Sequence, residues 1–143
     1  MQLDYKTYPI LYVDDDPQVL SAFRLAFGED LNVRTCSSPE EALAMIRAGA
    51  DISVLLVDQR MPGLTGAQLL TEVRKVRPEL VRMMVTAYAD MGAVTSAVND
   101  GNISRFIVKP WRHEEMLAAL TNAIDMFHMS RRVRDLQMEL FKG

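Results

Sequence analysis

Side chains able to take part in phosphoryl transfer stand at the ends of four apolar runs of the sequence. They include three consecutive acids near the start of the chain and a single acid after a Leu-Leu-Val run. Clustered carboxylates repel one another, and a hard divalent cation is the usual remedy, here Mg²⁺ with Mn²⁺ as the alternative. A carboxylate beside such a cation, a hydroxyl and an ammonium group can accept a phosphoryl group. In chain order the side chains are Asp14, Asp15, Asp16, Asp58, Thr86 and Lys109.

This chemistry requires that the four runs end close together in space. Asp58 alone would fit an ordinary turn before Pro62 and Gly63. The run of residues 52–57, however, is short and rich in β-branched residues, and it predicts a strand that is buried on both faces. The carboxyl ends of parallel strands lie on one edge of a sheet, where open α/β sheets place their sites. We therefore expect the acids to meet Thr86 and Lys109 at this edge.

Strand-like and helix-like segments alternate along the chain with short connections. Right-handed crossovers then require a doubly wound, five-stranded parallel sheet with helices on both faces, which is an α/β fold. The last helix begins near Arg112 and meets no breaker before Gly143, so we expect an extended C-terminal helix. The predicted strands span residues 8–13, 31–36, 52–57, 81–86 and 105–108.

Capping residues predict where the helices begin, and apolar spacing predicts which faces they bury. The expected caps are Asp16, Ser38 in a capping box with Glu41, Thr65 in a capping box with Gln68, and Asp90. The third helix is expected to bury Leu69, Val73 and Val76. The first helix is expected to bury Val19, Ala22, Phe23, Ala26 and Phe27.

Composition excludes several classes of protein. A net charge of −3 argues against direct nucleic-acid binding and against an anionic-membrane surface. The single cysteine excludes an internal disulfide, and no apolar run is long enough to cross a membrane. We therefore expect a cytoplasmic protein. Trp111, which follows Lys109-Pro110, either contacts a partner at the sheet edge or covers the base of the last helix.

In its ordered motifs the chain resembles the receiver domain of bacterial two-component response regulators. The resemblance covers roughly residues 8–128. It rests on Val13-Asp14-Asp15-Asp16, on Asp58 before Met61-Pro62-Gly63, on Thr86-Ala87 and on Lys109-Pro110. The resemblance implies the flavodoxin-like strand order 2-1-3-4-5 and a cis peptide bond between Lys109 and Pro110.

The resemblance also implies a role for each site residue. Asp58 is similar to the phosphoacceptor, with Thr86 and Lys109 completing the catalytic set. Thr86 and Phe106 are similar to the switch residues of the family. The implied metal ligands are Asp15, Asp58, the backbone carbonyl of Arg60, and Asp14 through water. Asp16 is better explained as a helix cap.

The implied function is that of a phosphorylated signalling protein in a phosphorelay, and not of a turnover enzyme. A sensor histidine kinase would phosphorylate Asp58, and the face built from the fourth helix, fifth strand and fifth helix would change. Arg60 and Tyr88 flank the path of a hydrolytic water, so we expect slow autodephosphorylation. One alternative is a phosphorylation-independent binding module with the same fold. A second is a haloacid-dehalogenase-type phosphatase using Asp14, which Gln18 argues against because that motif requires Thr or Val there.

The last helix extends past the expected domain. We divide the chain into a receiver domain, residues 1–128, and a helical extension, residues 129–143, which would be a coiled-coil linker to an output domain if the chain is a fragment. Apolar residues recur along it at alternating spacings of three and four, which favours a parallel homodimer. These residues are Met126, Met129, Val133, Leu136 and Leu140. A solvated single helix is the alternative, because two heptads make a weak pattern.

Overall fold

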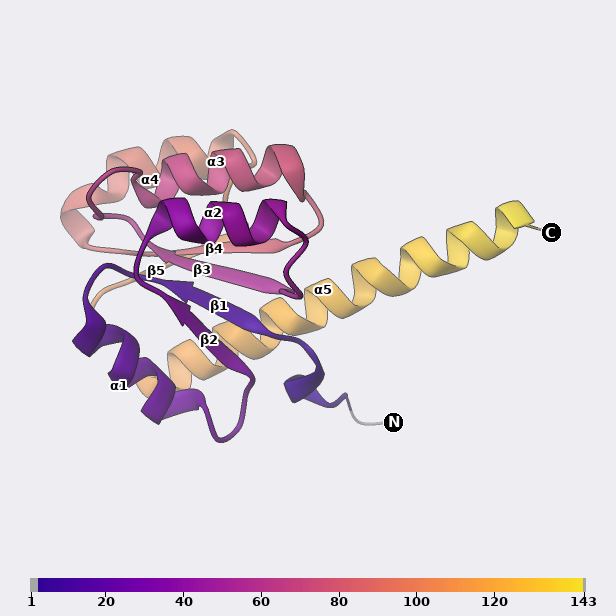
Figure 1. Ribbon diagram of the computed structural model, residues 1–143, viewed down its shortest axis with the longest axis horizontal. Helices are drawn as coiled ribbons and strands as arrows, with labels where there is room; N and C mark the ends of the chain where they lie inside the picture. The colour runs from indigo at the N-terminus through magenta and orange to yellow at the C-terminus, as the bar shows by residue number, and fades with distance from the viewer. Residues whose placement is uncertain (1–2, 143) are drawn as a thin grey trace.

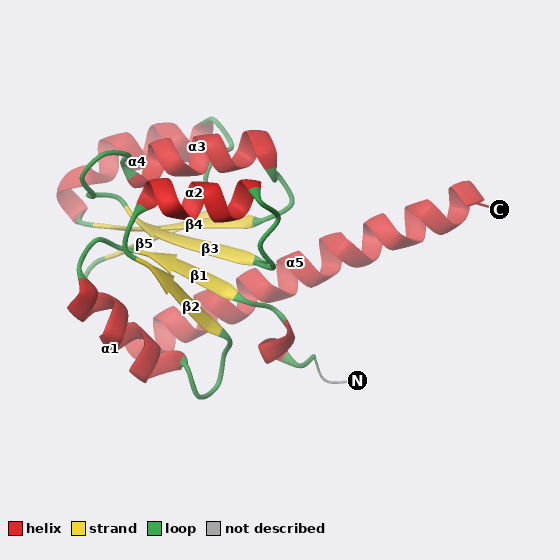
Figure 2. Cartoon of the chain, viewed as in Figure 1, coloured by secondary structure: helices red, strands yellow, loops and turns green. Residues whose placement is uncertain are grey.

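Five parallel strands form one sheet at the centre of the protein (Figures 1 and 2). The computed structural model describes residues 3–142. The strand order is β2-β1-β3-β4-β5, so the predicted order 2-1-3-4-5 is confirmed. The strands are β1 (Ile10–Val13), β2 (Val33–Cys36), β3 (Val54–Asp58), β4 (Val81–Thr86) and β5 (Arg105–Val108).

Helices cover both faces of the sheet, as the crossover rule requires. Figure 1 shows α2, α3 and α4 on one face and α1 and α5 on the other. The α-helices are α1 (Pro17–Phe27), α2 (Pro39–Arg47), α3 (Gly66–Val76), α4 (Met91–Asn99) and α5 (His113–Lys142). Two short 3₁₀ turns that were not predicted, η1 and η2, span Tyr5–Thr7 and Tyr88–Asp90.

The core lies on the central strands. Every residue of β1, β3 and β4 is buried, whereas β2 at the edge is largely half-exposed. Each fully buried Val, Leu or Met contributes roughly 1.5–3 kcal/mol. The sheet order and the continuous burial of β3 confirm the predicted central strand, although it spans Val54–Asp58 and not residues 52–57. Asp58 is therefore the last residue of this buried strand.

The helix caps agree with the sequence in part. Thr65 and Gln68 form a reciprocal capping box, and the Asp16 carboxylate accepts a hydrogen bond from the Gln18 amide. Ser38 makes only half of its predicted box: its hydroxyl accepts from the Glu41 amide, but the Glu41 side chain does not accept from the Ser38 amide. The Ser38 hydroxyl itself donates to Glu40. The prediction for Asp90 was wrong: its carboxylate makes no cap, since the Arg60 guanidinium occupies it.

The buried faces of two helices differ from their predicted stripes. In α1, Ala22 and Ala26 are exposed, and Leu20 joins Phe23 and Phe27 in the core. A spacing of three and four residues from Leu20 centres the larger side chains on the sheet and turns the alanines toward solvent. In α3, the terminal Val76 is 43% exposed, and Leu70 is buried beside Leu69 and Val73 instead.

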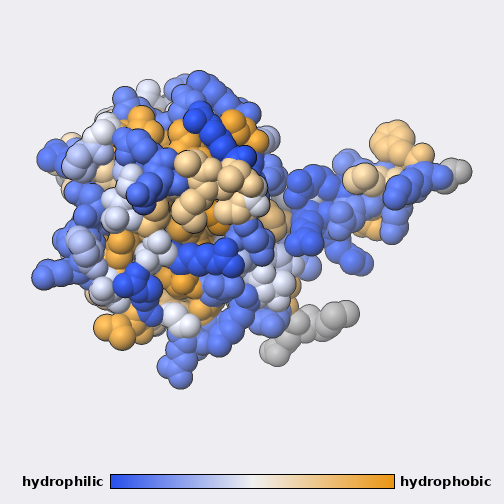
Figure 3. Space-filling model, in the orientation of Figure 1, coloured by the Kyte–Doolittle hydropathy of each residue, from blue (hydrophilic) through white to orange (hydrophobic). Residues whose placement is uncertain are grey.

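The helix α5 continues without a break from the sheet into solvent (Figure 1). Its buried residues end at Phe127. Beyond that point Figure 3 shows blue and orange side chains mixed on the projecting end. The predicted apolar stripe of Met126, Met129, Val133, Leu136 and Leu140 is 49% to 81% exposed. Within residues 3–142, no helix has both the length and the apolar character needed to cross a membrane.

The base of the projecting helix is held by the N-terminal segment. The Tyr5 hydroxyl donates to Asp125 Oδ1 over 3.1 Å, and the Tyr8 hydroxyl lies 2.5 Å from His128 Nδ1. The Tyr8 ring also packs edge-on against Phe127. His128 is therefore a packing residue at the point where α5 leaves the domain.

Candidate functional site

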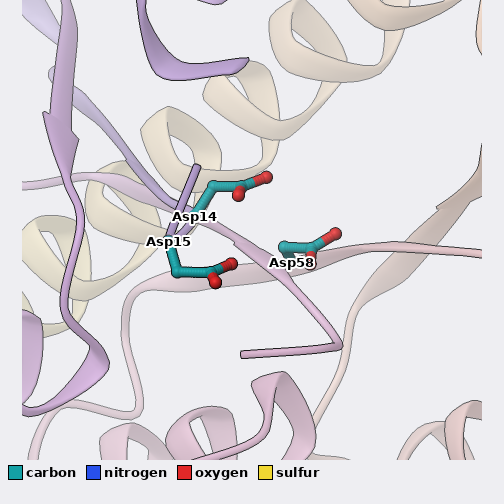
Figure 4. Close-up of side chains that lie close together, drawn as sticks. All are labelled: Asp14, Asp15 and Asp58. Atoms are coloured by element: carbon teal, nitrogen blue, oxygen red, sulfur yellow. The ribbon is translucent and has the colours of Figure 1, made fainter. Parts of the chain in front are cut away.

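Three carboxylates meet at the carboxyl edge of the sheet (Figure 4). Asp14 and Asp15 follow β1, and Asp58 ends the neighbouring β3, in a register that pairs Val13 with Val57. One carboxylate oxygen from each acid lies within 4.8 Å of those of the other two. Asp14 and Asp58 are buried, whereas Asp15 is exposed. Asp16, the residue read as a cap, is outside this group.

A lysine completes the charge arrangement around Asp58. Lys109 follows β5, and its Nζ lies 2.5 Å from Asp58 Oδ1. The Lys109 amide also donates to the Thr86 carbonyl over 2.8 Å, which ties the end of β5 to the end of β4. The Lys109-Pro110 peptide bond is cis, as the resemblance implied.

Thr86 stands at the same edge but has a different partner. It is buried at the end of β4, and its hydroxyl donates to the Ala87 carbonyl over 3.2 Å. A cavity of about 50 Å³ separates it from the other groups. The lining residues are Asp58, Gln59, Arg60, Thr86, Ala87, Asp90 and Lys109.

Phe106 lies away from this cavity. It is half-buried in β5, paired with Met84 of β4. It lines a separate groove of about 480 Å³ along β5, together with Lys109 and Glu115. The sheet therefore brings the predicted site side chains together at one edge, with the exception of Phe106. Phe106 lines the groove along β5 instead of the cavity.

The electrostatics of Asp58 are dominated by burial. Burial raises the pKa of the Asp58 carboxyl, the hydrogen bond and charge of Lys109 lower it, and the charges of Asp14 and Asp15 raise it again. The net shift is upward from the ordinary value, so the folded protein disfavours the ionised form. A cation near the three acids would relieve this repulsion.

The donor set fits a hard divalent cation. All three side chains offer carboxylate oxygens, which Mg²⁺ and Mn²⁺ prefer, and two of the acids are held by adjacent strands. The chain's one cysteine, Cys36, is buried at the end of β2 and directs its thiol to the Ser38 carbonyl. The site therefore presents oxygen ligands to a metal and no soft sulfur ligand.

The Arg60 side chain lines the cavity together with Asp90. Its guanidinium donates to both carboxylate oxygens of Asp90, with Nε to Oδ2 and Nη2 to Oδ1 each at 2.9 Å. Asp90 was a residue that sequence reasoning missed as part of the site. No local signal indicates this pair, because the two residues lie thirty positions apart and meet only through the fold.

Tyr12 is a second residue that sequence reasoning missed. Its hydroxyl donates to Asp14 Oδ2 over 3.0 Å, and burial together with the Asp14 charge raises the pKa of the Tyr12 phenol far above its ordinary value. The phenol therefore keeps its proton. A signal was present in the sequence, since residues two apart on a strand point to the same face.

Trp111 is partly buried and packs against the core. Its ring contacts Phe23 and Phe27 of α1, with ring centroids 6.3 and 5.9 Å away. His113, the first residue of α5, stacks on Phe27. Of the two alternatives for Trp111, covering the base of the last helix fits this packing.

Comparison with known proteins decides the family. The model of the response regulator receiver domain matches residues 10–121 of the chain. The chain belongs to the response regulator receiver family. Proteins of this family are signalling domains of two-component phosphorelays, and they generally bind Mg²⁺ at an acidic pocket.

Longer bacterial regulators and a solved receiver domain are similar to the chain. The hydrogenase transcriptional regulatory protein HoxA of Cupriavidus necator is 36% identical over 94% of this chain and 28% of its own length. The DNA-binding transcriptional regulator NtrC of Salmonella typhimurium is 31% identical over 88% of this chain and 27% of its own length. A response regulator receiver domain protein from Clostridium thermocellum is 27% identical, with a TM-score of 0.80 and coverage of 85% of this chain and 98% of its own. The chain thus spans little more than a quarter of the curated relatives named here.

Proposed function

We propose that this chain is a phosphoacceptor receiver in which Asp58 takes a phosphoryl group from the phosphohistidine of a sensor histidine kinase. The observation that carries the proposal is the placement of Asp58 between opposite charges. Lys109 Nζ lies 2.5 Å from one oxygen of Asp58. One carboxylate oxygen each of Asp14 and Asp15 lies within 4.8 Å of an Asp58 oxygen.

The transfer is a displacement at phosphorus. An ionised oxygen of Asp58 forms a bond to phosphorus while the phosphorus–nitrogen bond to the histidine breaks, and the imidazole nitrogen leaves with the electron pair and takes up a proton. The positive charge of the Lys109 ammonium stabilises the negative charge on the oxygens of the transferred group. The Thr86 hydroxyl, which now donates to a backbone carbonyl, would rotate to donate to one of those oxygens.

A divalent cation fits the same site. The residues that would hold it are Asp15 and Asp58, the backbone carbonyl of Arg60, and Asp14 through water. When bound, Mg²⁺ or Mn²⁺ would supply further neutralisation of the phosphoryl oxygens. Of this chain's own groups, Lys109 favours the ionised form of Asp58, whereas Asp14 and Asp15 raise the pKa of Asp58 and would instead help to hold the cation.

Phosphorylation would bias a conformational equilibrium. Once Thr86 turns toward the phosphoryl group, the half-buried Phe106 would move into the space left behind. That movement would change the face built from α4, β5 and α5, as a population shift produced by a new charge. The chain would then act as a switch and not as a turnover enzyme.

The output would be carried by α5. We propose that residues 1–128 form the receiver and that the extension from residue 129 pairs with its copy in a parallel dimer. The exposed apolar stripe supports this, because each Val or Leu buried in a seam contributes roughly 1.5–3 kcal/mol. The similarity to HoxA and NtrC, which are named as transcriptional regulators and are several times longer, supports a downstream effector domain.

Phosphorylation of Asp58 is tested by intact-mass analysis after incubation with acetyl phosphate and Mg²⁺. The native chain should gain one phosphoryl group, and Asp58→Asn should gain none. Asp16→Asn is the matched control, because it keeps a capping side chain next to the site and should be labelled like the native chain. An adduct that persists in Asp58→Asn would contradict the assignment.

Further assays of the native chain distinguish this proposal from the two alternative functions. Repeated turnover of para-nitrophenyl phosphate with Mg²⁺ would favour a phosphatase that uses Asp14. A native chain that gains no adduct from acetyl phosphate and does not bind beryllofluoride would favour a binding module that works without phosphorylation.

A further inference from the structure

A buried phenol is bonded to one of the three acids of the site. Tyr12 lies in β1, two residues before Asp14, and its side chain is only 1% exposed. Its hydroxyl donates to Asp14 Oδ2 over 3.0 Å, and Asp14 itself is 3% exposed. A hydrogen bond between two buried polar groups is strong, and removing one of the two groups leaves the other without a hydrogen-bond partner.

The bond fixes the direction of the Asp14 carboxylate. Its other oxygen, Oδ1, accepts from the Asp16 amide over 3.0 Å. With one donor on each oxygen the carboxylate plane is set, and each oxygen keeps a lone pair for a further partner. Within residues 3–142, the Tyr12 hydroxyl donates to Asp14 and to neither of the other two acids, and the side-chain partner of Asp58 is Lys109.

The Tyr12 ring has little freedom to move away. It packs against Phe23 of α1 with ring centroids 4.5 Å apart. Phe23 in turn contacts Phe27 and Trp111, at 4.8 and 6.3 Å. A buried aromatic cluster therefore holds the phenol, and through the phenol the acid, in one place.

We propose that Tyr12 is a positioning residue for the metal site, holding Asp14 in the orientation from which it assists the cation. The proposal rests on the metal-dependent acceptor role proposed for Asp58. The groups that surround a metal's own ligands orient those ligands, and their loss typically weakens metal binding by about 10- to 100-fold. Because Asp14 acts through water, the lower end of that range applies here.

The test is a measurement of the Mg²⁺ affinity of the full chain without any phosphodonor. The affinity is obtained from the changes in backbone amide chemical shifts during an NMR titration with Mg²⁺. Tyr12→Phe removes only the hydroxyl and keeps the ring, so the fold should persist. Its Mg²⁺ dissociation constant should rise about tenfold. Tyr8→Phe is the matched control, because it also removes the hydroxyl of a buried tyrosine, but one that faces His128. Its dissociation constant should equal that of the native chain.

A double-mutant cycle distinguishes positioning from a general loss of packing. With Asp14→Asn already present, adding Tyr12→Phe should change the Mg²⁺ affinity no further, because the acid that Tyr12 orients is gone. A further loss in that background, or an unchanged or tighter affinity in Tyr12→Phe alone, would overturn the inference.

A measurement on the native chain covers the case in which Tyr12→Phe fails to fold. With ¹³C-labelled tyrosine, Mg²⁺ should shift the ring resonances of Tyr12 and leave those of Tyr8 in place. Unmoved Tyr12 resonances, with Mg²⁺ bound at the acids, would overturn the inference and leave the proposed function standing. A native chain that binds no Mg²⁺ would instead remove the metal site on which both depend.

Discussion

The charge on Asp58 is disfavoured in the folded protein, because the carboxyl is buried next to two other acids. Its pKa in the folded state is raised, chiefly by burial, in spite of Lys109. A group whose folded pKa lies above its unfolded value adds stability below the unfolded pKa. That contribution is lost as the pH rises through the folded pKa. At neutral pH, therefore, ionised Asp58 lowers the free energy of unfolding.

Asp58→Asn should consequently raise the stability of the protein at pH 7 by about 1 kcal/mol, or a few °C in Tm. The gain should shrink toward zero as the pH falls into the range where Asp58 is protonated. Thermal unfolding monitored by circular dichroism from pH 7 to pH 3.5 checks this. Asp51→Asn, an exposed acid outside the cluster, is the control and should show no such trend. A constant gain at every pH would contradict the ionisation argument.

The pair formed by Arg60 and Asp90 should protect the phosphoryl group. Both residues line the cavity beside Asp58, and Tyr88 stands at the start of the turn that carries Asp90. Arg60→Ala and Tyr88→Ala should each shorten the phosphoryl half-life severalfold, because water then reaches the acyl phosphate more easily. Decay of the phosphorylated mass measures this, with Arg47→Ala on α2 as the control. Unchanged half-lives would show that bulk at these positions does not shield the site.

Residues at strand ends were predictable, and residues that act through the fold were not. Asp58 and Lys109 could be placed because parallel strands deliver their last residues to one edge. The sequence predicts Asp90 as a helix cap, since nothing local indicates that its carboxylate would bind Arg60. Tyr12 falls in a predicted apolar strand, and that pattern does not indicate the hydrogen bond from its hydroxyl to Asp14.

At the level of elements, the start of α3 is packed directly against the strand end that carries the acceptor. The Gly66 amide donates to the Gln59 carbonyl over 2.9 Å, and the Gln59 side-chain oxygen accepts from the Ala67 amide. A Cβ on Gly66 would lie 2.6 Å from the Asp58 carbonyl oxygen and 2.9 Å from the Gln59 Cα. Both are backbone atoms, so neither can give way without moving β3.

Gly66→Ala should therefore destabilise the protein by about 2–4 kcal/mol and reduce phosphorylation of Asp58. Gly92→Ala is the matched control, because Gly92 lies in α4 with nothing within 4 Å of its added Cβ. That change should leave stability equal or raise it by about 0.5–1 kcal/mol. Urea unfolding of the two variants measures the difference. Equal stabilities would mean that the loop after β3 is free to yield.

The elements themselves were more predictable than their buried faces. The bounds of β4 and β5 match the sequence reading, because β-branched runs between clear stop signals leave little choice. The stripe of α1 was displaced, because alanine counts as apolar in a pattern but has little area to bury. Leu20 faces the core instead, because burying a leucine removes far more apolar surface from water than burying an alanine.

For the whole molecule, the exposed stripe on α5 predicts a dimer. The full chain should sediment as a dimer at tens of micromolar, roughly the range a modest interface reaches, and a version ending at Phe127 as a monomer. Leu136→Glu should dissociate the dimer, because it puts a charge into the seam. Met138→Glu is the control, since Met138 is also exposed, at 61% against 50% for Leu136, but lies outside the stripe. If full chain and truncated chain are both monomeric, with and without beryllofluoride, the stripe is solvated.

The unbroken course of α5 also has a mechanical consequence. One end is clamped among the core and the tyrosines of the N-terminal segment, and the other end stands free, so the helix works as an arm with its pivot near Phe127. At 1.5 Å per residue the arm from residue 128 to Lys142 is about 22 Å long, so a tilt of about 5° would carry its tip about 2 Å. A flexible tether of the same number of residues would average such a tilt away. A small rearrangement at the sheet edge would therefore produce a larger movement at the tip of α5, and in a defined direction.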